Sequence, residues 1–254
     1  MTVQPWGLAA MLVASHLSAS IAAADDVLIF AAASTAVALK EAIHQYGKTS
    51  ADRVRASYAS SGALARQLDN GAPASLYLSA NTKWMGWAEK KGLLATGTKT
   101  DLLRNRLVLV QADSVISMLI ERDLKGWLHQ VREQRLAIAD PAHAPAGDYA
   151  KAALASLRLW KSLSGRTVRA QNVRAALLLV ERQEAALGII YQTDAQASNA
   201  VRILATFPEN SHPTILYGLA IVRNKDNSAT RRFYDFLKSP AGMINFQHFG
   251  FLPP

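Results

Sequence analysis

The feature that most constrains the fold is a repeated succession of apolar run, polar turn and helical segment. Residues 27–32 (VLIFAA) form a continuous apolar run, which is typical of a strand buried on both faces. Two hydroxyl residues, Ser34 and Thr35, follow it. Apolar residues then recur at positions 36, 39, 43 and 46, the spacing of an amphipathic helix, which we expect to end at Gly47. A buried strand that feeds a helix through a short turn is the unit of an α/β sheet.

The same alternation continues to the end of the chain. We expect further strands at residues 76–80, 107–110, 136–139, 187–190 and 215–222. We expect further helices at residues 64–68, 83–91, 119–131, 149–159, 173–181, 231–238 and 241–249. The pattern predicts an α/β protein, in which ligands bind beyond the carboxyl ends of the strands. With 254 residues the chain is long enough for two lobes of about 100 residues each.

The N-terminal segment indicates export. Residues 6–21 are predominantly apolar and are followed by Ala22, Ala23 and Ala24 before two aspartates. This pattern predicts a signal peptide, residues 1–24, cleaved after Ala24. No Lys or Arg precedes the apolar stretch, so only the terminal amine supplies the positive charge that such a signal carries.

Composition and motifs exclude several classes of function. The formal net charge is +9, but Lys and Arg are scattered, so a solvated basic surface is expected rather than a nucleic-acid site. The chain has no cysteine, and its six histidines lack metal-ligand spacing, so no catalytic metal or cation ligand is expected. It has neither a P-loop nor a G-x-G-x-x-G motif, so no nucleotide cofactor is expected.

Four junctions are suited to binding an anion. At Ser34, Ser61, Ala146 and Val173, a strand or loop meets the start of an expected helix. A helix N-terminus presents unpaired N–H groups and roughly half a positive charge, so four that converge would supply about +2. Ser60 is expected to shape the turn before Ser61, where a simple helix cap is the competing interpretation.

A serine hydrolase is the alternative from another class. Ser61 would be the nucleophile, with His143 and Asp140 as partners. There is no G-x-S-x-G motif, and the prolines around His143 favour a role in shaping the loop for both partners. A third possibility, the sensing half of a DNA-binding regulator, is disfavoured by the export signal.

From about residue 27 to residue 252, the chain resembles the periplasmic molybdate-binding proteins that feed ABC importers. The matching segments are FAAAS at 30–34, YASSGALARQ at 58–67, GAP at 71–73, DP at 140–141, PAG at 145–147, VR at 173–174, VER at 180–182, LGIIY at 187–191 and ATFP at 205–208. They keep their order and spacing over nearly the whole mature chain. The resemblance implies two Rossmann-like lobes with mixed, mainly parallel sheets joined by a hinge (a type II periplasmic binding protein). We expect lobe 1 at residues 25–104 plus 215–254 and lobe 2 at residues 105–214.

The resemblance also implies a ligand, a set of contacts and partners. One tetrahedral oxyanion, molybdate or tungstate, would be bound by the hydroxyl and N–H groups of Ser34 and Ser61, the N–H groups of Ala146 and Val173, and the Tyr191 hydroxyl. Another oxyanion such as sulfate is the alternative ligand. The protein would be a periplasmic, monomeric, non-enzymatic binding protein without a cofactor, and its partners would be the permease and ATPase of the importer.

Four positions near this set need separate expectations. Ser75 and Asn81 stand where the family commonly has Asp, which puts stability or closure in doubt more than the oxyanion contacts. Asp148 is expected to cap its helix and to face away from the anion. Gly62 is expected to let the backbone approach the ligand closely.

Overall fold

The computed structural model describes residues 26–114, 123–130 and 134–254. The expected signal peptide, residues 1–24, lies outside this range. The expected helix at 119–131 lies partly outside it, and its described part is α4 (Leu124–Gln130). No helix in the described ranges combines the length and the apolar character needed to cross a membrane.

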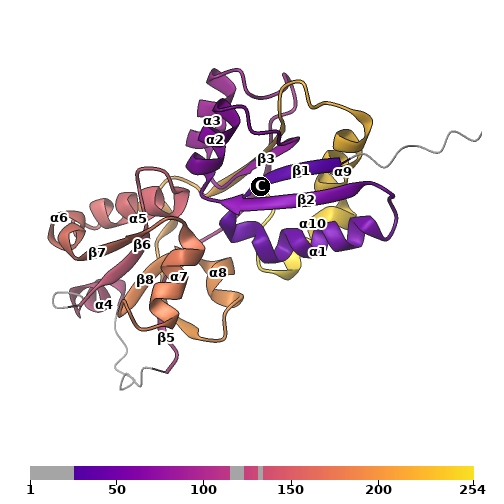
Figure 1. Ribbon diagram of the computed structural model, residues 1–254. Helices are drawn as coiled ribbons and strands as arrows, with labels where there is room; N and C mark the ends of the chain where they lie inside the picture. The colour runs from indigo at the N-terminus through magenta and orange to yellow at the C-terminus, as the bar shows by residue number, and fades with distance from the viewer. Residues whose placement is uncertain (1–25, 115–122, 131–133) are drawn as a thin grey trace, which may run out of the picture.

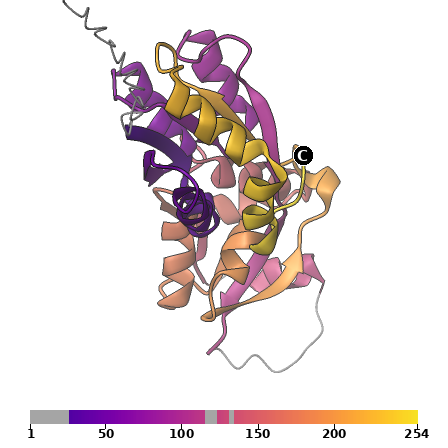
Figure 2. The same cartoon turned by 90° about the vertical axis from the view of Figure 1, so that its right-hand side faces the viewer.

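The chain forms two lobes, each built on a five-stranded mixed sheet (Figure 1). The first sheet has the order β2 (Arg53–Ala59), β1 (Asp26–Ala32), β3 (Leu76–Ser79), β10 (Leu216–Ile221) and β4 (Thr100–Arg104). Its helical elements are η1 (Ala33–Thr35), α1 (Ala36–Gly47), α2 (Ser61–Asp69), α3 (Thr82–Lys90), α9 (Ser228–Lys238) and α10 (Pro240–His248). The C-terminal helices therefore return to the lobe that contains β1, as both views show (Figure 2).

The second sheet has the order β7 (Thr167–Ala170), β6 (Leu136–Ala139), β8 (Leu187–Tyr191), β5 (Leu107–Ala112) and β9 (Val201–Thr206). Besides α4, its helical elements are α5 (Pro145–Ser156), α6 (Trp160–Leu163), η3 (Ser164–Arg166), α7 (Val173–Glu181), α8 (Gln192–Gln196) and η4 (Glu209–Ser211). Two connections link the sheets, one from β4 to β5 and one from β9 to β10.

The α/β two-lobe fold expected from the sequence is confirmed, with more antiparallel pairing than expected. In the first sheet β1 pairs in parallel with β2 and β3, whereas β10 is antiparallel to β3 and β4. In the second, β6 pairs in parallel with β7 and β8, whereas β5 is antiparallel to β8 and β9. The antiparallel strands are those next to the two connections between the lobes.

The central strands are buried on both faces, as their apolar runs predict. Every residue of β3, β6 and β8 is buried, and so are the apolar residues of β5. The edge strands β2, β4, β7 and β9 carry charged residues and are partly exposed. The buried central strands also position the turns and helices that follow them, because a strand that is fixed in the sheet fixes the point where the next turn begins.

Candidate functional site

The five candidate ligand residues line one cavity between the lobes. The cavity is small, about 10 Å³, roughly room for the centre of one water-sized molecule. Residues from both lobes line it: Ala32, Ala33, Ser34, Ala59, Ser60, Ser61, Ala80, Ala144, Pro145, Ala146, Asn172, Val173 and Tyr191. α7 of the second lobe contacts η1 of the first at this place. No residue of the lining carries a charged side chain.

Ser34 follows the buried strand β1 directly. It lies in the short 3-10 helix η1, so α1 itself begins two residues later, at Ala36. The Ser34 side chain is buried, and its Oγ lies 2.9 Å from the hydroxyl oxygen of Tyr217.

Ser61 is the first residue of α2, and Ser60 is the N-cap. Ser60 Oγ accepts a hydrogen bond from the Ala63 N–H at 3.4 Å, so the capping interpretation of this stretch holds for Ser60. Ser61 Oγ accepts a hydrogen bond from the Ala80 N–H at 2.9 Å. The donor of that bond is an amide, so the hydroxyl hydrogen of Ser61 stays available to a ligand.

Ala146 and Val173 lie in the first turns of α5 and α7. Pro145 opens α5, so Ala146 has the first amide hydrogen of that helix. Asn172 caps α7 by accepting a hydrogen bond from the Ala175 N–H at 3.0 Å, as its sequence position predicts. The N–H groups of Ala146 and Val173 have no acceptor inside their helices, because the first four residues of a helix lack one.

Tyr191 ends β8 and is 1% exposed. Its hydroxyl is buried and has no hydrogen-bond partner within the described residues. Burial raises the pKa of Tyr191 well above its ordinary value, so the hydroxyl stays protonated. A buried hydroxyl without a partner costs on the order of 1–3 kcal/mol, and an acceptor placed in the cavity would remove that cost.

The cavity is therefore lined by hydrogen-bond donors without a compensating cation. Ser34, Ser61, Ala146 and Val173 all lie at or near helix starts, where the positive end of the helix dipole is located. Such a site suits an anion that accepts hydrogen bonds at every oxygen. Within the described residues no group of three or more His, Cys, Asp or Glu side chains could hold a metal ion.

Contacts between the lobes surround the cavity; they correct the expectations for Gly62 and Asp148 and bear on the hydrolase alternative through His143. The Gly62 N–H donates to the His143 carbonyl at 3.0 Å, so Gly62 allows close approach of the other lobe and is not in the cavity lining. His143 Nδ1 lies 3.0 Å from Ser60 Oγ, so this histidine bonds Ser60 and not Ser61. Asp148 pairs with Lys83 Nζ at 2.7 Å instead of capping its own helix.

The positions at which the chain departs from the family pattern keep structural roles. Asn81 caps α3 by accepting a hydrogen bond from the Trp84 N–H at 3.0 Å. Ser75 Oγ accepts a hydrogen bond from the Leu28 N–H at 3.4 Å, which ties the start of β3 to β1. Asp140 shapes its loop as expected, because its carboxylate accepts a hydrogen bond from the Ala142 N–H at 3.0 Å.

Two buried polar residues beside the cavity were not predicted from the sequence. Tyr217 lies in β10 and contacts Ser34, and Asn105 lies in the connection from β4 to β5 and contacts Tyr217. Tyr217 stands in the apolar run LYGLAI and gave no signal of a polar role. Asn105 lies at the expected boundary between the lobes, and this position is the feature of the sequence that could have indicated a role near the cavity.

Comparison with known proteins agrees with this architecture. Residues 27–252 match the family described as bacterial extracellular solute-binding protein. The chain is 43% identical over 240 residues to "Molybdate-binding protein ModA" of Escherichia coli K12, covering 93% of each chain. It is 39% identical over 243 residues to the protein of the same name from Haemophilus influenzae, covering 95% of each. The solved Azotobacter vinelandii periplasmic molybdate-binding protein has the same fold, with a TM-score of 0.79 at 24% identity over 90% of this chain and 99% of that one. The chain therefore belongs to the bacterial extracellular solute-binding protein family.

Proposed function

We propose that the protein is a periplasmic binding protein that captures molybdate, and also tungstate, between its lobes and delivers it to an ABC importer. Its partners are the permease and ATPase of that importer, and it acts as a monomer without a cofactor or enzymatic activity. The proposal is supported by the relatives named as molybdate-binding proteins and by the donor-lined cavity. The observation that carries it is the buried, unpartnered hydroxyl of Tyr191 in that cavity.

The proposed contacts are the hydroxyls of Ser34, Ser61 and Tyr191 and the backbone N–H groups of Ser34, Ser61, Ala146 and Val173. All of these are donors. Molybdate is fully deprotonated at neutral pH and accepts hydrogen bonds at all four oxygens, whereas hydrogen phosphate carries a proton that needs an acceptor. Sulfate lacks a proton as well, so it has to be rejected by size: a smaller tetrahedron leaves some buried donors without a partner, each at about 1–3 kcal/mol.

We propose the lobe division expected from the sequence, residues 25–104 plus 215–254 and residues 105–214, after removal of a signal peptide at 1–24. It is supported by the two connections between the sheets: the first begins after β4 ends at Arg104, and the second ends where β10 begins at Leu216. Closure of the lobes about these connections would complete the donor shell around the anion and give the importer a distinct liganded form.

The serine hydrolase alternative is not favoured. Ser61 Oγ accepts a hydrogen bond from the Ala80 N–H at 2.9 Å and bonds no general base among the described residues, and His143 bonds Ser60 instead. Ser60 Oγ is itself the cap of α2, so activating it would remove a helix cap.

Calorimetric titration of the purified protein with molybdate, tungstate, sulfate and phosphate tests the proposal. We expect tight binding of the first two and a large rise in melting temperature, since a ligand at 100 times its Kd adds about 2.7 kcal/mol to stability. Ser61→Ala is expected to weaken molybdate binding while the fold is kept. Ser211→Ala is the matched control, because Ser211 is a buried serine bonded to the Pro208 carbonyl outside the cavity lining. Equal binding of all four anions, or of none, would refute the proposal.

A further inference from the structure

A chain of buried hydrogen bonds connects the cavity to the link between the lobes. Ser34 Oγ lies 2.9 Å from the Tyr217 hydroxyl oxygen. Asn105 Nδ2 donates to the same Tyr217 oxygen at 3.2 Å and to Thr193 Oγ1 at 2.9 Å. All four residues are at least nine-tenths buried, so water does not compete for these bonds. The donor and acceptor in each of these hydrogen bonds can be assigned, starting from the groups that can only donate.

The Asn105 amide sets that direction. Its Oδ1 accepts a hydrogen bond from the Arg106 N–H at 2.9 Å, so its Nδ2 must face Tyr217 and Thr193. An amide NH₂ group can only donate, and Tyr217 Oη is therefore the acceptor in that bond. Tyr217 is fully buried, and the Ser34 and Asn105 bonds are its hydroxyl's partners within the described residues. Its own hydrogen is thus directed to Ser34 Oγ.

Ser34 is left in the same state as Ser61. Ser34 Oγ accepts from Tyr217, and Ser61 Oγ accepts from the Ala80 N–H. Each serine therefore has its hydrogen available for the cavity, which both residues line. In both cases the donated bond uses one of the two lone pairs of the serine oxygen, so the serine hydrogen has to find its acceptor in another direction, and the cavity provides one.

We propose that Asn105 and Tyr217 are positioning residues that hold the Ser34 hydroxyl as a donor and thereby select oxyanions that carry no proton. The inference rests on the proposed function and names the groups that enforce its selectivity. If a protonated oxyanion donates its O–H to the remaining lone pair of Ser34 Oγ, either the Ser34 hydrogen or the Tyr217 hydrogen loses its acceptor, and a buried donor is left unpaired. Burial raises the pKa of Tyr217 above its ordinary value, so its hydroxyl keeps the proton that it donates to Ser34.

Tyr217→Phe tests the proposal by removing only the hydroxyl. The Ser34 hydroxyl is then free to turn, so we expect molybdate binding to weaken by about fivefold to tenfold, the effect of one hydrogen bond. Binding of inorganic phosphate at about pH 8, where the dianion carries one proton, should stay the same or strengthen. The selectivity for molybdate over phosphate should therefore fall. Titration measures both affinities, and the phosphate concentration that gives a fixed rise in melting temperature provides a second measure.

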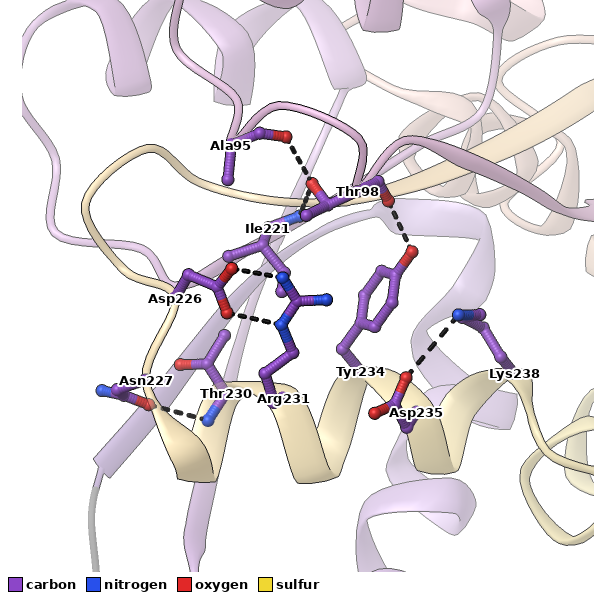
Figure 3. A network of polar contacts seen from close by, with 10 residues as sticks. All are labelled: Ala95, Thr98, Ile221, Asp226, Asn227, Thr230, Arg231, Tyr234, Asp235 and Lys238. Carbon is purple, nitrogen blue, oxygen red and sulfur yellow. Dashed lines mark hydrogen bonds and ion pairs between the residues drawn. The ribbon is translucent and has the colours of Figure 1, made fainter.

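Tyr234→Phe is the matched control. Tyr234 is also a buried tyrosine of the first lobe, and its hydroxyl donates to the Thr98 carbonyl (Figure 3). Neither residue lines the cavity. We expect it to lower stability about as much as Tyr217→Phe while the selectivity is unchanged. An equal change in both affinities in Tyr217→Phe, or no gain for phosphate relative to molybdate, would overturn the proposal.

A double-mutant cycle gives an independent readout. Because Asn105 and Tyr217 act through Ser34, we expect Tyr217→Phe and Asn105→Ala to change molybdate affinity by less than about twofold in a Ser34→Ala background. Effects as large as in the parent protein would show a general structural role and overturn the proposal. If the parent protein binds none of the oxyanions, the proposed function fails; if it binds them and the variants keep its selectivity, only this inference fails.

Discussion

The Gly62 N–H donates a hydrogen bond to the His143 carbonyl at 3.0 Å, across the boundary between the lobes. A Cβ atom added at Gly62 would lie 2.4 Å from that carbonyl oxygen and 2.5 Å from the ring of Trp84. Gly62 follows Ser61, so the contact lies beside the proposed anion site. Close approach of the lobes therefore depends on the absence of a side chain at this position.

Gly62→Ala is expected to hold the lobes apart. Overpacking costs about 1–3 kcal/mol, so molybdate affinity should fall by about fivefold to a hundredfold. Titration calorimetry measures the affinity, and X-ray scattering with and without molybdate measures compaction. Gly86→Ala is the control, because nothing lies within 4 Å of the added Cβ in α3. We expect that variant to bind normally, and equal affinities in both variants would contradict the prediction.

Tyr191→Phe is expected to change binding and stability in different directions. Removing the hydroxyl should weaken molybdate binding by about tenfold to a hundredfold, the value of a hydrogen bond to a charged group. Without ligand the variant should be as stable as the parent protein or more stable, because a buried hydroxyl without a partner is lost.

Tyr77→Phe provides the contrast. The Tyr77 hydroxyl donates to the Ser61 carbonyl at 2.8 Å, so its removal should lower the stability of the unliganded protein by about 1 kcal/mol. Chemical unfolding of both variants without ligand compares the two effects. A clear loss of stability in Tyr191→Phe would mean that its hydroxyl has a partner in the unliganded protein.

The contacts of Asp52 predict how the stability of the protein falls at low pH. Its buried carboxylate accepts two hydrogen bonds from Arg232, at 2.6 and 2.9 Å, and one from Tyr46 at 2.7 Å. These bonds lower the pKa of Asp52 to about 2 from 3.8. The stabilisation, about 2 kcal/mol, is present above pH 4 and is lost as the pH falls from about 4 to about 2.

Asp52→Asn should therefore lower stability at neutral pH and flatten its dependence on pH between about 4 and 2. Urea unfolding at several pH values measures both effects. Asp226→Asn is the control: the Asp226–Arg231 pair (Figure 3) is exposed, and such pairs contribute about 0–1 kcal/mol. If Asp52→Asn and the parent protein lose stability in acid in the same way, the loss comes from groups other than Asp52.

The sequence predicted the central strands and some of the helix starts for a physical reason, although α5 and α9 begin at Pro145 and Ser228, before the expected residues 149 and 231. A strand buried on both faces has to be a continuous apolar run, and α7 has to begin where Asn172 can cap it. Residues 136–139 and 173–181 were therefore predicted at their observed bounds. The edge strands β4, β7 and β9 were not predicted, because each pairs on one side only and carries exposed or charged residues.

The candidate site was only partly accessible from the sequence. The five proposed ligand residues could be named because helix starts and the family resemblance lead to them, and they line one cavity. The contacts of Gly62, His143 and Asp148 could not be named, because they depend on how the two lobes meet. Tyr217 and Asn105 could not be named either, because their contacts join residues that are far apart in sequence: Ser34 and Tyr217 are 183 residues apart, and Tyr217 and Asn105 are 112 residues apart.

Arg174 and Asp194 join α7, which carries Val173, to α8, which directly follows Tyr191. Arg174 follows Val173 at the start of α7, and Asp194 lies in α8 directly after Tyr191. Arg174 Nε lies 2.6 Å from Asp194 Oδ1, and the Asp194 side chain is fully buried. Burial raises the pKa of Asp194 to about 6, against the opposing effect of Arg174.

Arg174→Met should leave this carboxylate buried without a cation, which should lower stability by about 3 kcal/mol or more near neutral pH. Loss of the Arg174 guanidinium should also raise the pKa of Asp194 further. A raised pKa stabilises the folded protein below the unfolded pKa, 3.8, and that advantage is lost as the pH rises through the folded pKa. The variant should therefore lose less stability at pH 5 than at pH 7.5, as measured by urea unfolding. Adding Asp194→Asn should restore most of the loss and remove its dependence on pH, because no buried charge is then left; a loss that is equal at both pH values would contradict this role for the pair.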